Sequence, residues 1–133
     1  ILENSARTAQ DAAKALDCNV GAIVKSLLFR AGDDFILCLV AGDKRCSLNK
    51  LKKLKDKKDI LMASPEEVKT QTGYTIGGVS PIGHLNKIEI LIDKSLERFN
   101  QLFAAAGHPN CVFKINFINI QKITNGKVED IIE

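Results

Sequence analysis

The sequence predicts an α+β domain with a mixed or largely antiparallel sheet. Two pairs of apolar segments are each separated by a short turn-forming stretch, which is the pattern of a β-hairpin. Short segments that begin with Ser, Thr or Asp have the capping residues of helices. The chain has 133 residues, of which 45% are hydrophobic and 26% charged, so a single globular domain is expected over residues 1–133.

The first third of the chain predicts a helix followed by a hairpin. Thr8 and Asp11 resemble a capping box, and helical spacing of apolar residues follows over Ala9–Leu16. Ala22–Arg30 and Phe35–Ala41 flank a turn and form the first hairpin. Its second strand is apolar on both faces, so burial on both faces is expected.

The remaining elements alternate between helices and strands. Ser47 can cap a helix that runs to about Lys55, and Ser64 with Pro65 is a strong helix start. The expected order is helix 47–55, strand 60–62, helix 64–72, strand 87–92, a short helix 93–99 capped by Asp93, a second hairpin 102–106 with 111–117, a helical turn 119–124 and a last strand 127–132.

Composition excludes several classes of function. No apolar run approaches the ~20 residues that span a bilayer, so a soluble, cytoplasmic protein is expected. Neither a metal site nor a cofactor is expected, because the cysteines form no C-x-x-C and no histidine has ligand spacing. They are interpreted as small hydrophobes, reduced as in the cytosol: Cys18, Cys38, Cys46 and Cys111. The sequence begins with Ile1 rather than Met, which leaves a preceding segment open.

A glycine-rich stretch, Thr72–Gly83, holds four of the nine glycines. Glycine is used where the backbone takes a positive φ or where another molecule approaches the main chain. The stretch is therefore either a substrate-facing loop or a pair of ordinary turns. It contains no phosphate-loop or dinucleotide motif.

Lys25 stands out among the apolar residues of the first predicted strand. Period-two alternation places it on the same face as Ile23, Leu27 and Phe29. An ammonium on an apolar face is costly to bury without a partner. The side chain either reaches the rim of the sheet or lines a pocket.

Positive charge is concentrated between Asp43 and Asp59, where eight of the nineteen Lys and Arg residues lie. Such a stretch can bind the phosphates of a polyanion or form the solvated face of a helix. The candidate contacts for nucleic acid are Lys44, Arg45, Lys50, Lys52, Lys53 and Lys55.

Several motifs in order resemble the YbaK/prolyl-tRNA synthetase-associated domain family, whose members hydrolyse mischarged aminoacyl-tRNA. They are Thr8-Ala9-x-x-Ala12-Ala13, Ile23-Val24-Lys25-Ser26-Leu27, Val40-Ala41-Gly42-Asp43-Lys44-Arg45, Thr72-Gly73-Tyr74, Gly77-Gly78-Val79-Ser80-Pro81-Ile82-Gly83 and Ala106-Gly107-His108-Pro109. The resemblance covers roughly residues 5–130.

The resemblance implies a barrel-like mixed sheet with flanking helices, and a pocket between a strand lysine and a G-x-x-x-P loop. Carried over to this sequence, the catalytic positions are Lys25, Gly77, Gly78 and Pro81. The substrate-binding positions are Ser26, Val79, Ser80 and His108. The implied partners are the acceptor end of an aminoacyl-tRNA and an aminoacyl-tRNA synthetase.

The function implied is that of a metal-independent deacylase acting in trans on mischarged tRNA, of the Cys-tRNA(Pro) or Ala-tRNA(Pro) type, with assistance from the ribose 2′-hydroxyl. An activated ester needs orientation and a held water more than a strong protein base. The alternative is a non-catalytic tRNA- or synthetase-binding module on the same fold.

Overall fold

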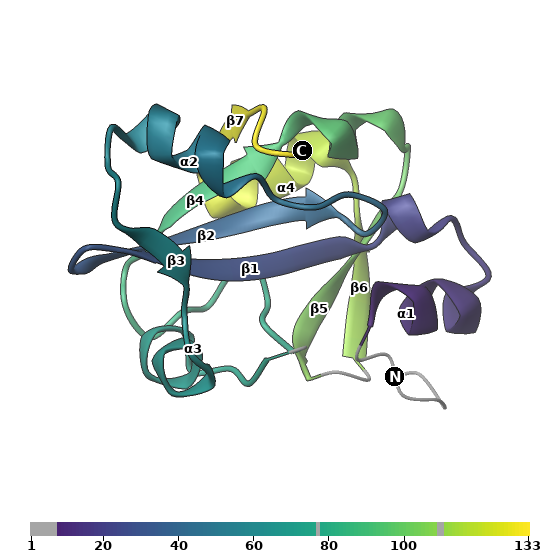
Figure 1. The fold of residues 1–133 in the computed structure, drawn as a ribbon. Helices are drawn as coiled ribbons and strands as arrows, with labels where there is room; N and C mark the ends of the chain where they lie inside the picture. The colour runs from purple at the N-terminus through teal and green to yellow at the C-terminus, as the bar shows by residue number, and fades with distance from the viewer. Residues whose placement is uncertain (1–7, 77, 109–110) are drawn as a thin grey trace.

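The computed structural model describes residues 8–76, 78–108 and 111–133 (Figure 1). Its elements, in chain order, are α1 (Ala9–Leu16), η1 (Val20–Ala22), β1 (Val24–Ala31), β2 (Asp34–Ala41), α2 (Leu48–Lys55), β3 (Ile60–Met62), α3 (Pro65–Thr72), β4 (Glu89–Asp93), η2 (Lys94–Arg98), β5 (Leu102–His108), β6 (Cys111–Ile115), α4 (Phe117–Thr124) and β7 (Lys127–Glu129). The elements η1 and η2 are 3₁₀ helices.

The main sheet is mixed and has the strand order β3-β1-β2-β4-β7. β1 pairs antiparallel with β2 and β3, whereas β4 lies parallel to β2 and β7 lies parallel to β4. β5 and β6 form a separate antiparallel ribbon, which in Figure 1 runs across the direction of β1. A parallel bridge between Ile23 and Phe103 joins this ribbon to the start of β1.

Each face of the main sheet has its own core. Val24 and Leu28 of β1 face a cluster that includes Val68 of α3, Leu102 of β5 and Ile120 of α4. The opposite face of the sheet is covered by α2 and by the C-terminal segment. There Phe29 packs with Cys38 and Val40 of β2, Leu51 of α2 and Ile131.

The predicted caps explain where most helices begin. The side chains of Thr8, Ser47 and Ser64 each accept a hydrogen bond from a backbone N–H of the first helical turn. Ser64 and Glu67 form a complete capping box. Asp93 caps η2 and is fully buried. Its second oxygen accepts a hydrogen bond from Ile131 N–H at 2.8 Å, which helps to offset the cost of burying the carboxylate.

The α+β class, the mixed sheet and both hairpins predicted from the sequence are confirmed. The second strand is buried on both faces, since the side chains from Ile36 to Ala41 are at most 2% exposed. Several boundaries are wrong by one to three residues; for example, β1 begins at Val24 rather than Ala22, and β4 begins at Glu89 rather than Lys87. Phe117 begins α4 rather than ending a strand, because Asn116 caps that helix, and the last strand stops at Glu129.

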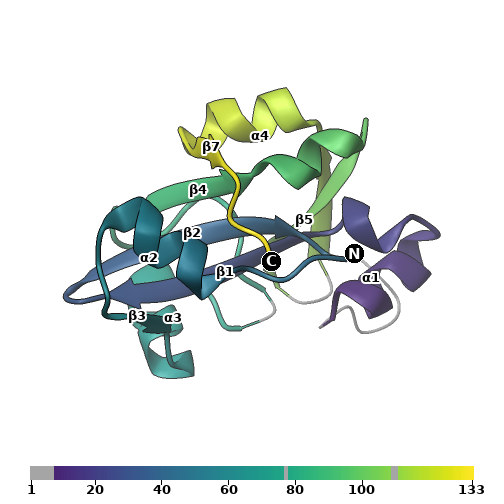
Figure 2. The same cartoon turned by 45° about the horizontal axis from the view of Figure 1, so that its top comes forward.

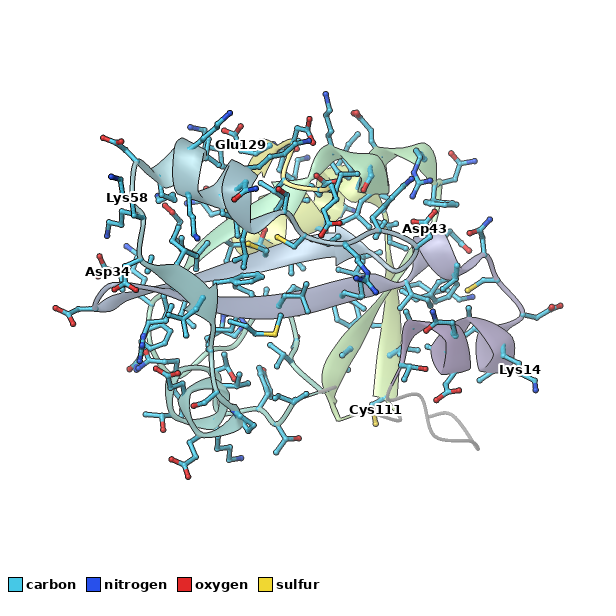
Figure 3. All side chains as sticks on the ribbon, viewed as in Figure 1. Lys14, Asp34, Asp43, Lys58, Cys111 and Glu129 are labelled. Carbon is cyan, nitrogen blue, oxygen red and sulfur yellow. The ribbon has the colours of Figure 1, made fainter. Side chains whose placement is uncertain are left out.

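The prediction for the cysteines is only partly correct. Cys38 is buried, whereas Cys18, Cys46 and Cys111 are half-buried, and all four are free thiols. Cys111 lies at the end of the β5–β6 ribbon (Figure 3), where β6 begins. Among the helices that the structure describes, none is long and apolar enough to cross a membrane.

Candidate functional site

A cavity of about 580 Å³ lies along β1, on the side that does not face β2. Both faces of β1 contribute to it through Lys25 and Ser26. The rest of its wall comes from α1, the turn after β2, α3, the glycine-rich stretch and the β5–β6 ribbon. Segments that lie far apart in the sequence therefore meet at one strand.

The cavity exists because β3 covers only part of β1. β3 pairs with Phe29–Ala31, so on the side of β1 away from β2 no described strand pairs with Val24–Leu28. The Leu28 carbonyl points to this side, since it accepts a hydrogen bond from Ala63 N–H at 3.0 Å. Backbone groups alternate along a strand, so the N–H and C=O of Ser26 face the cavity as well.

Lys25 and Ser26 lie on opposite faces of the sheet at this open edge. Lys25 pairs with Val40 and shares its face with Leu27 and Phe29, as the alternation predicts. Ile23 does not belong to this face, because it precedes the strand and packs with α1. The hydroxyl oxygen of Ser26 is buried and has no hydrogen-bond partner among the described residues.

The Lys25 ammonium is half-buried and donates a hydrogen bond to the backbone carbonyl of Lys44. Burial lowers the pKa of Lys25, and the nearby Arg45 guanidinium lowers it further, whereas Asp43 and Cys46 act in the opposite direction. Lys25 therefore lines the cavity while its ammonium is hydrogen-bonded to the Lys44 carbonyl. Lys44 and Arg45 line the cavity beside it.

The glycine-rich stretch is built around Tyr74. Its hydroxyl donates a hydrogen bond to the Ile82 carbonyl at 2.9 Å, and its ring stands edge-on to His84. A Cβ at Gly83 would lie 2.6 Å from this hydroxyl, and one at Gly107 would lie 3.0 Å from the ring. Both glycines also have positive φ, and the absence of a Cβ allows them to pack closely on Tyr74.

Residues 73–76 and 78–83 form neither helix nor strand, as their composition predicts. Ile76 and Val79 line the cavity, and Val79 is buried beside Val24 and Leu28. Gly78 donates its N–H to the Thr75 carbonyl at 3.0 Å, which closes a turn. The stretch is thus both a set of turns and one wall of the cavity.

The structure brings only some of the predicted site residues together. Lys25, Ser26 and Val79 line the cavity, whereas Gly78, Ser80 and Pro81 are buried and do not. Ser80 accepts a hydrogen bond from Ile82 N–H, and its carbonyl accepts one from His84 Nε2 at 2.7 Å. Gly77 and the side chain of His108 lie outside what the structure describes.

Lys50, Lys52, Lys53 and Lys55 lie on α2, and none of them lines the cavity. Lys50 pairs with Asp130 at 3.0 Å and Lys55 pairs with Glu89. Lys52 and Lys53 belong to no ion pair within the described ranges. The predicted basic stretch is therefore divided into residues at the cavity and residues on a helix that is partly neutralised.

Sequence reasoning missed the hydrophobic wall of the cavity, which is formed by Met62, Ile76, Phe103, Ala105 and Val112. Met62 and Ile76 are more than half exposed, at 56% and 58%. Large exposed apolar side chains beside a cavity are typical of a binding site. Among the described residues, no group of three or more His, Cys, Asp and Glu side chains has the geometry of a metal site.

Comparison with known proteins identifies relatives over nearly the whole chain. Residues 3–123 match the model of the aminoacyl-tRNA editing domain family. The uncharacterised protein YwhH of Bacillus subtilis is 36% identical over 127 residues, which are 95% of this chain and 80% of YwhH. Proline–tRNA ligase of Thermosipho melanesiensis is 29% identical over 87% of this chain, but the chain spans only 20% of that ligase.

A solved structure has the same fold. A crystal structure described as a candidate trans-editing enzyme for prolyl-tRNA synthetase superposes with a TM-score of 0.94 at 37% identity, covering 99% of this chain and 83% of that one. The family and the fold predicted from the sequence motifs are confirmed by these matches.

Proposed function

This chain belongs to the aminoacyl-tRNA editing domain family, and from that membership we propose that it acts in trans as a deacylase on mischarged aminoacyl-tRNA. The observation that carries the proposal is the cavity at the open edge of β1, with Lys25, Ser26 and Val79 in its wall. Cysteine and alanine esters of proline tRNA are the proposed substrates. Their choice is supported by relatives named for prolyl-tRNA synthetase.

We propose that the aminoacyl group lies beside the free backbone of Ser26. A substrate amine can donate to the Ser26 carbonyl, and a substrate carbonyl can accept from its N–H, as a neighbouring strand would. Val79, Ala105 and Val112 supply an apolar surface for a small side chain. Ser26 Oγ and His108 are the proposed selectors of that side chain, because an unpaired hydroxyl gains most from a polar group that reaches it.

Lys25 and Arg45 are the proposed contacts for the phosphate that precedes the terminal nucleoside. Two cations close to each other hold a phosphate through charge-assisted hydrogen bonds. Binding a phosphate would also offset their mutual repulsion, which lowers the Lys25 pKa in the free protein. Lys44 and the lysines of α2 extend positive charge away from the cavity, toward the proposed position of the tRNA stem.

The proposed reaction is hydrolysis without a protein base. Water attacks the ester carbonyl, the acyl–oxygen bond breaks, and the 3′-oxygen leaves with a proton, giving free amino acid and uncharged tRNA. The neighbouring 2′-hydroxyl can relay that proton, so the protein mainly orients the ester and holds the water. Gly77, Gly78 and Pro81 are proposed as the backbone groups for this because their loop matches that of the family, although Gly78 and Pro81 do not line the cavity in this structure. The Gly78 N–H is already bonded to the Thr75 carbonyl, so its carbonyl is the proposed acceptor.

A deacylation panel tests the proposal. Proline tRNA charged with alanine, cysteine, serine or proline is incubated with the protein, with and without EDTA. We expect hydrolysis of a small non-cognate amino acid, no hydrolysis of proline, and no effect of the chelator. Tight binding of every tRNA without hydrolysis would instead establish a non-catalytic binding module.

A further inference from the structure

Asp43 and Arg98 form a bidentate ion pair between segments that are 55 residues apart. Arg98 Nη2 donates to Asp43 Oδ1 at 2.7 Å, and Nη1 donates to Oδ2 at 3.2 Å. Nε of the same guanidinium donates to the Ser95 carbonyl at 2.7 Å. Its central carbon lies 4.9 Å from the centre of the Phe99 ring. These partners fix the orientation in which the two donors reach Asp43.

Asp43 belongs to the turn that carries the Lys44 carbonyl. The turn is closed by a hydrogen bond from Lys44 N–H to the Ala41 carbonyl at 3.0 Å. A Cβ at Gly42 would lie 2.3 Å from the Val20 carbonyl oxygen, so the turn packs directly on η1. The turn therefore has little freedom to move toward η1.

The far side of this turn is also held. Glu133 N–H donates to the Arg45 carbonyl at 2.9 Å, and Ser47 N–H donates to the Ile131 carbonyl at 2.7 Å. Figure 2 shows the C-terminal segment running from β7 toward this turn. The turn around Lys44 is thus held on one side by Arg98, through Asp43, and on the other side by backbone hydrogen bonds with the C-terminal segment.

We propose that Arg98 is a positioning residue for the candidate site: through Asp43 it fixes the turn whose Lys44 carbonyl holds the Lys25 ammonium. The proposal rests on the deacylase function proposed above, because it gives Arg98 a role in that reaction. Asp43, Lys44 and Lys25 line the cavity, whereas Arg98 does not. A change at Arg98 therefore reaches the substrate only through the residues it holds.

The ion pair is better suited to positioning than to stabilising the fold. The side chains of Arg98 and Asp43 are 42% and 29% exposed, and ion pairs in such surroundings contribute little to folding stability. Small displacements of a group that binds substrate can nevertheless lower a rate by up to about a hundredfold. Loss of Arg98 should therefore reduce activity more than stability.

The test compares Arg98→Gln, Arg98→Lys, Asp43→Asn and the double variant Asp43→Asn/Arg98→Gln with the wild type. Asp34→Asn is the matched control, because it breaks the ion pair with Lys57 at the opposite end of the β1–β2 hairpin (Figure 3). Each protein is measured by single-turnover deacylation, by thermal unfolding and by the NMR signal of the Lys25 side chain, assigned with Lys25→Arg.

We expect Arg98→Gln to lower the rate by about tenfold and to shift the Lys25 signal, with little change in melting temperature. Arg98→Lys should recover part of the rate, and Asp34→Asn should change none of the three. The double variant should lose no more activity than the worse single variant, because both residues act through one pair.

An unshifted Lys25 signal in Arg98→Gln would overturn the proposal, and so would a shifted signal with an unchanged rate or additive losses in the double variant. If the wild type deacylates nothing, the proposed function is wrong, and the Lys25 signal alone then decides whether Arg98 positions that side chain.

Discussion

The ammonium of Lys25 donates a hydrogen bond to the backbone carbonyl of Lys44, across the open edge of β1. The alternation in the sequence left two positions for this side chain, at the rim or in a pocket. The structure combines them, because Lys25 lines the cavity and the turn after β2 supplies an acceptor for its ammonium. This contact makes Lys25 a fixed group rather than a mobile one.

Lys25→Ala should lower the deacylation rate by at least tenfold, because it removes a charge-assisted donor from a half-buried site. Lys25→Arg should also fail, since a planar fork does not replace a compact ammonium. The free energy of unfolding should change by only about 1 kcal/mol in either variant, because the lost hydrogen bond is offset by relief of a partly desolvated charge. Lys122→Ala, an exposed lysine on α4, is the control.

Single-turnover kinetics and melting temperature are to be measured on the same preparations. Full activity in Lys25→Ala, or a loss that only accompanies unfolding, would make Lys25 a structural residue.

The lowered pKa of Lys25 predicts a change of stability with pH. Between the folded pKa and the ordinary value of 10.5, the unfolded chain binds more protons than the folded one. The free energy of unfolding contributed by this group therefore rises with pH across that interval. Urea unfolding of the wild type and of Lys25→Gln at several values from pH 7 to 10.5 isolates the effect as a difference. A constant difference would contradict the lowered pKa.

The three pairs of basic residues should differ in how much each contributes to the salt dependence of tRNA binding. Lys44→Gln with Arg45→Gln should weaken binding and flatten its salt dependence by roughly 0.7–0.9 in log–log slope per lost phosphate contact. Lys52→Gln with Lys53→Gln should have a smaller effect. Lys50→Gln with Lys55→Gln should change the slope least, because Asp130 and Glu89 already neutralise these lysines.

Salt titrations of tRNA binding measure these slopes, and Lys94→Gln with Lys122→Gln is the control with the same loss of charge. Equal slopes for this control and for the pair at the cavity would show that Lys44 and Arg45 make no specific contact with the phosphates of the tRNA.

Ser26 and His108 should govern which amino acid is removed. Ser26→Leu should exclude the larger amino acids, since one methylene in such a pocket is worth about 1–3 kcal/mol. Ser26→Ala should be as stable as the wild type or more so, because the buried hydroxyl has no partner within the part of the chain that the structure describes. The ranking of mischarged tRNAs in Ser26→Ala, Ser26→Leu and His108→Ala measures the effect. An unchanged ranking in all three would show that neither residue selects the amino acid.

Local chemistry accounts for how far the sequence predicts this fold. Caps at Thr8, Ser47 and Ser64 act within one helical turn, so a linear motif is sufficient to find them. The partial cover of β1 by β3 cannot be found in this way, because it depends on pairing between strands that are distant in sequence. The same limit applies to Arg98, whose partner Asp43 carries no periodic signal that links the two.

The glycine-rich stretch also depends on contacts between residues that are distant in sequence. Its glycines predicted a close approach to the backbone, and at Gly83 the group that approaches is the side chain of Tyr74. Tyr74 therefore explains Gly83 and Gly107 together, although 24 residues separate them in the sequence. A tyrosine near clustered glycines is the signal in the sequence that could have indicated this.

Tyr74 yields the last prediction. Tyr74→Phe keeps the ring but loses the hydrogen bond to the Ile82 carbonyl, which should cost about 1 kcal/mol of stability and little activity. Tyr74→Ala leaves an unfilled space beside Gly83 and Gly107. Because the ring is half-buried, the loss of stability should lie near the lower end of the range of about 3–5 kcal/mol that is typical of a buried aromatic ring. Ile76 and Val79, which come shortly after Tyr74 in the sequence, line the cavity, so deacylation should also fall in Tyr74→Ala at temperatures where the protein remains folded.

Urea unfolding and single-turnover rates below the melting transition measure the two effects separately. Full activity in folded Tyr74→Ala would show that the glycine-rich stretch keeps the cavity wall in place without its tyrosine.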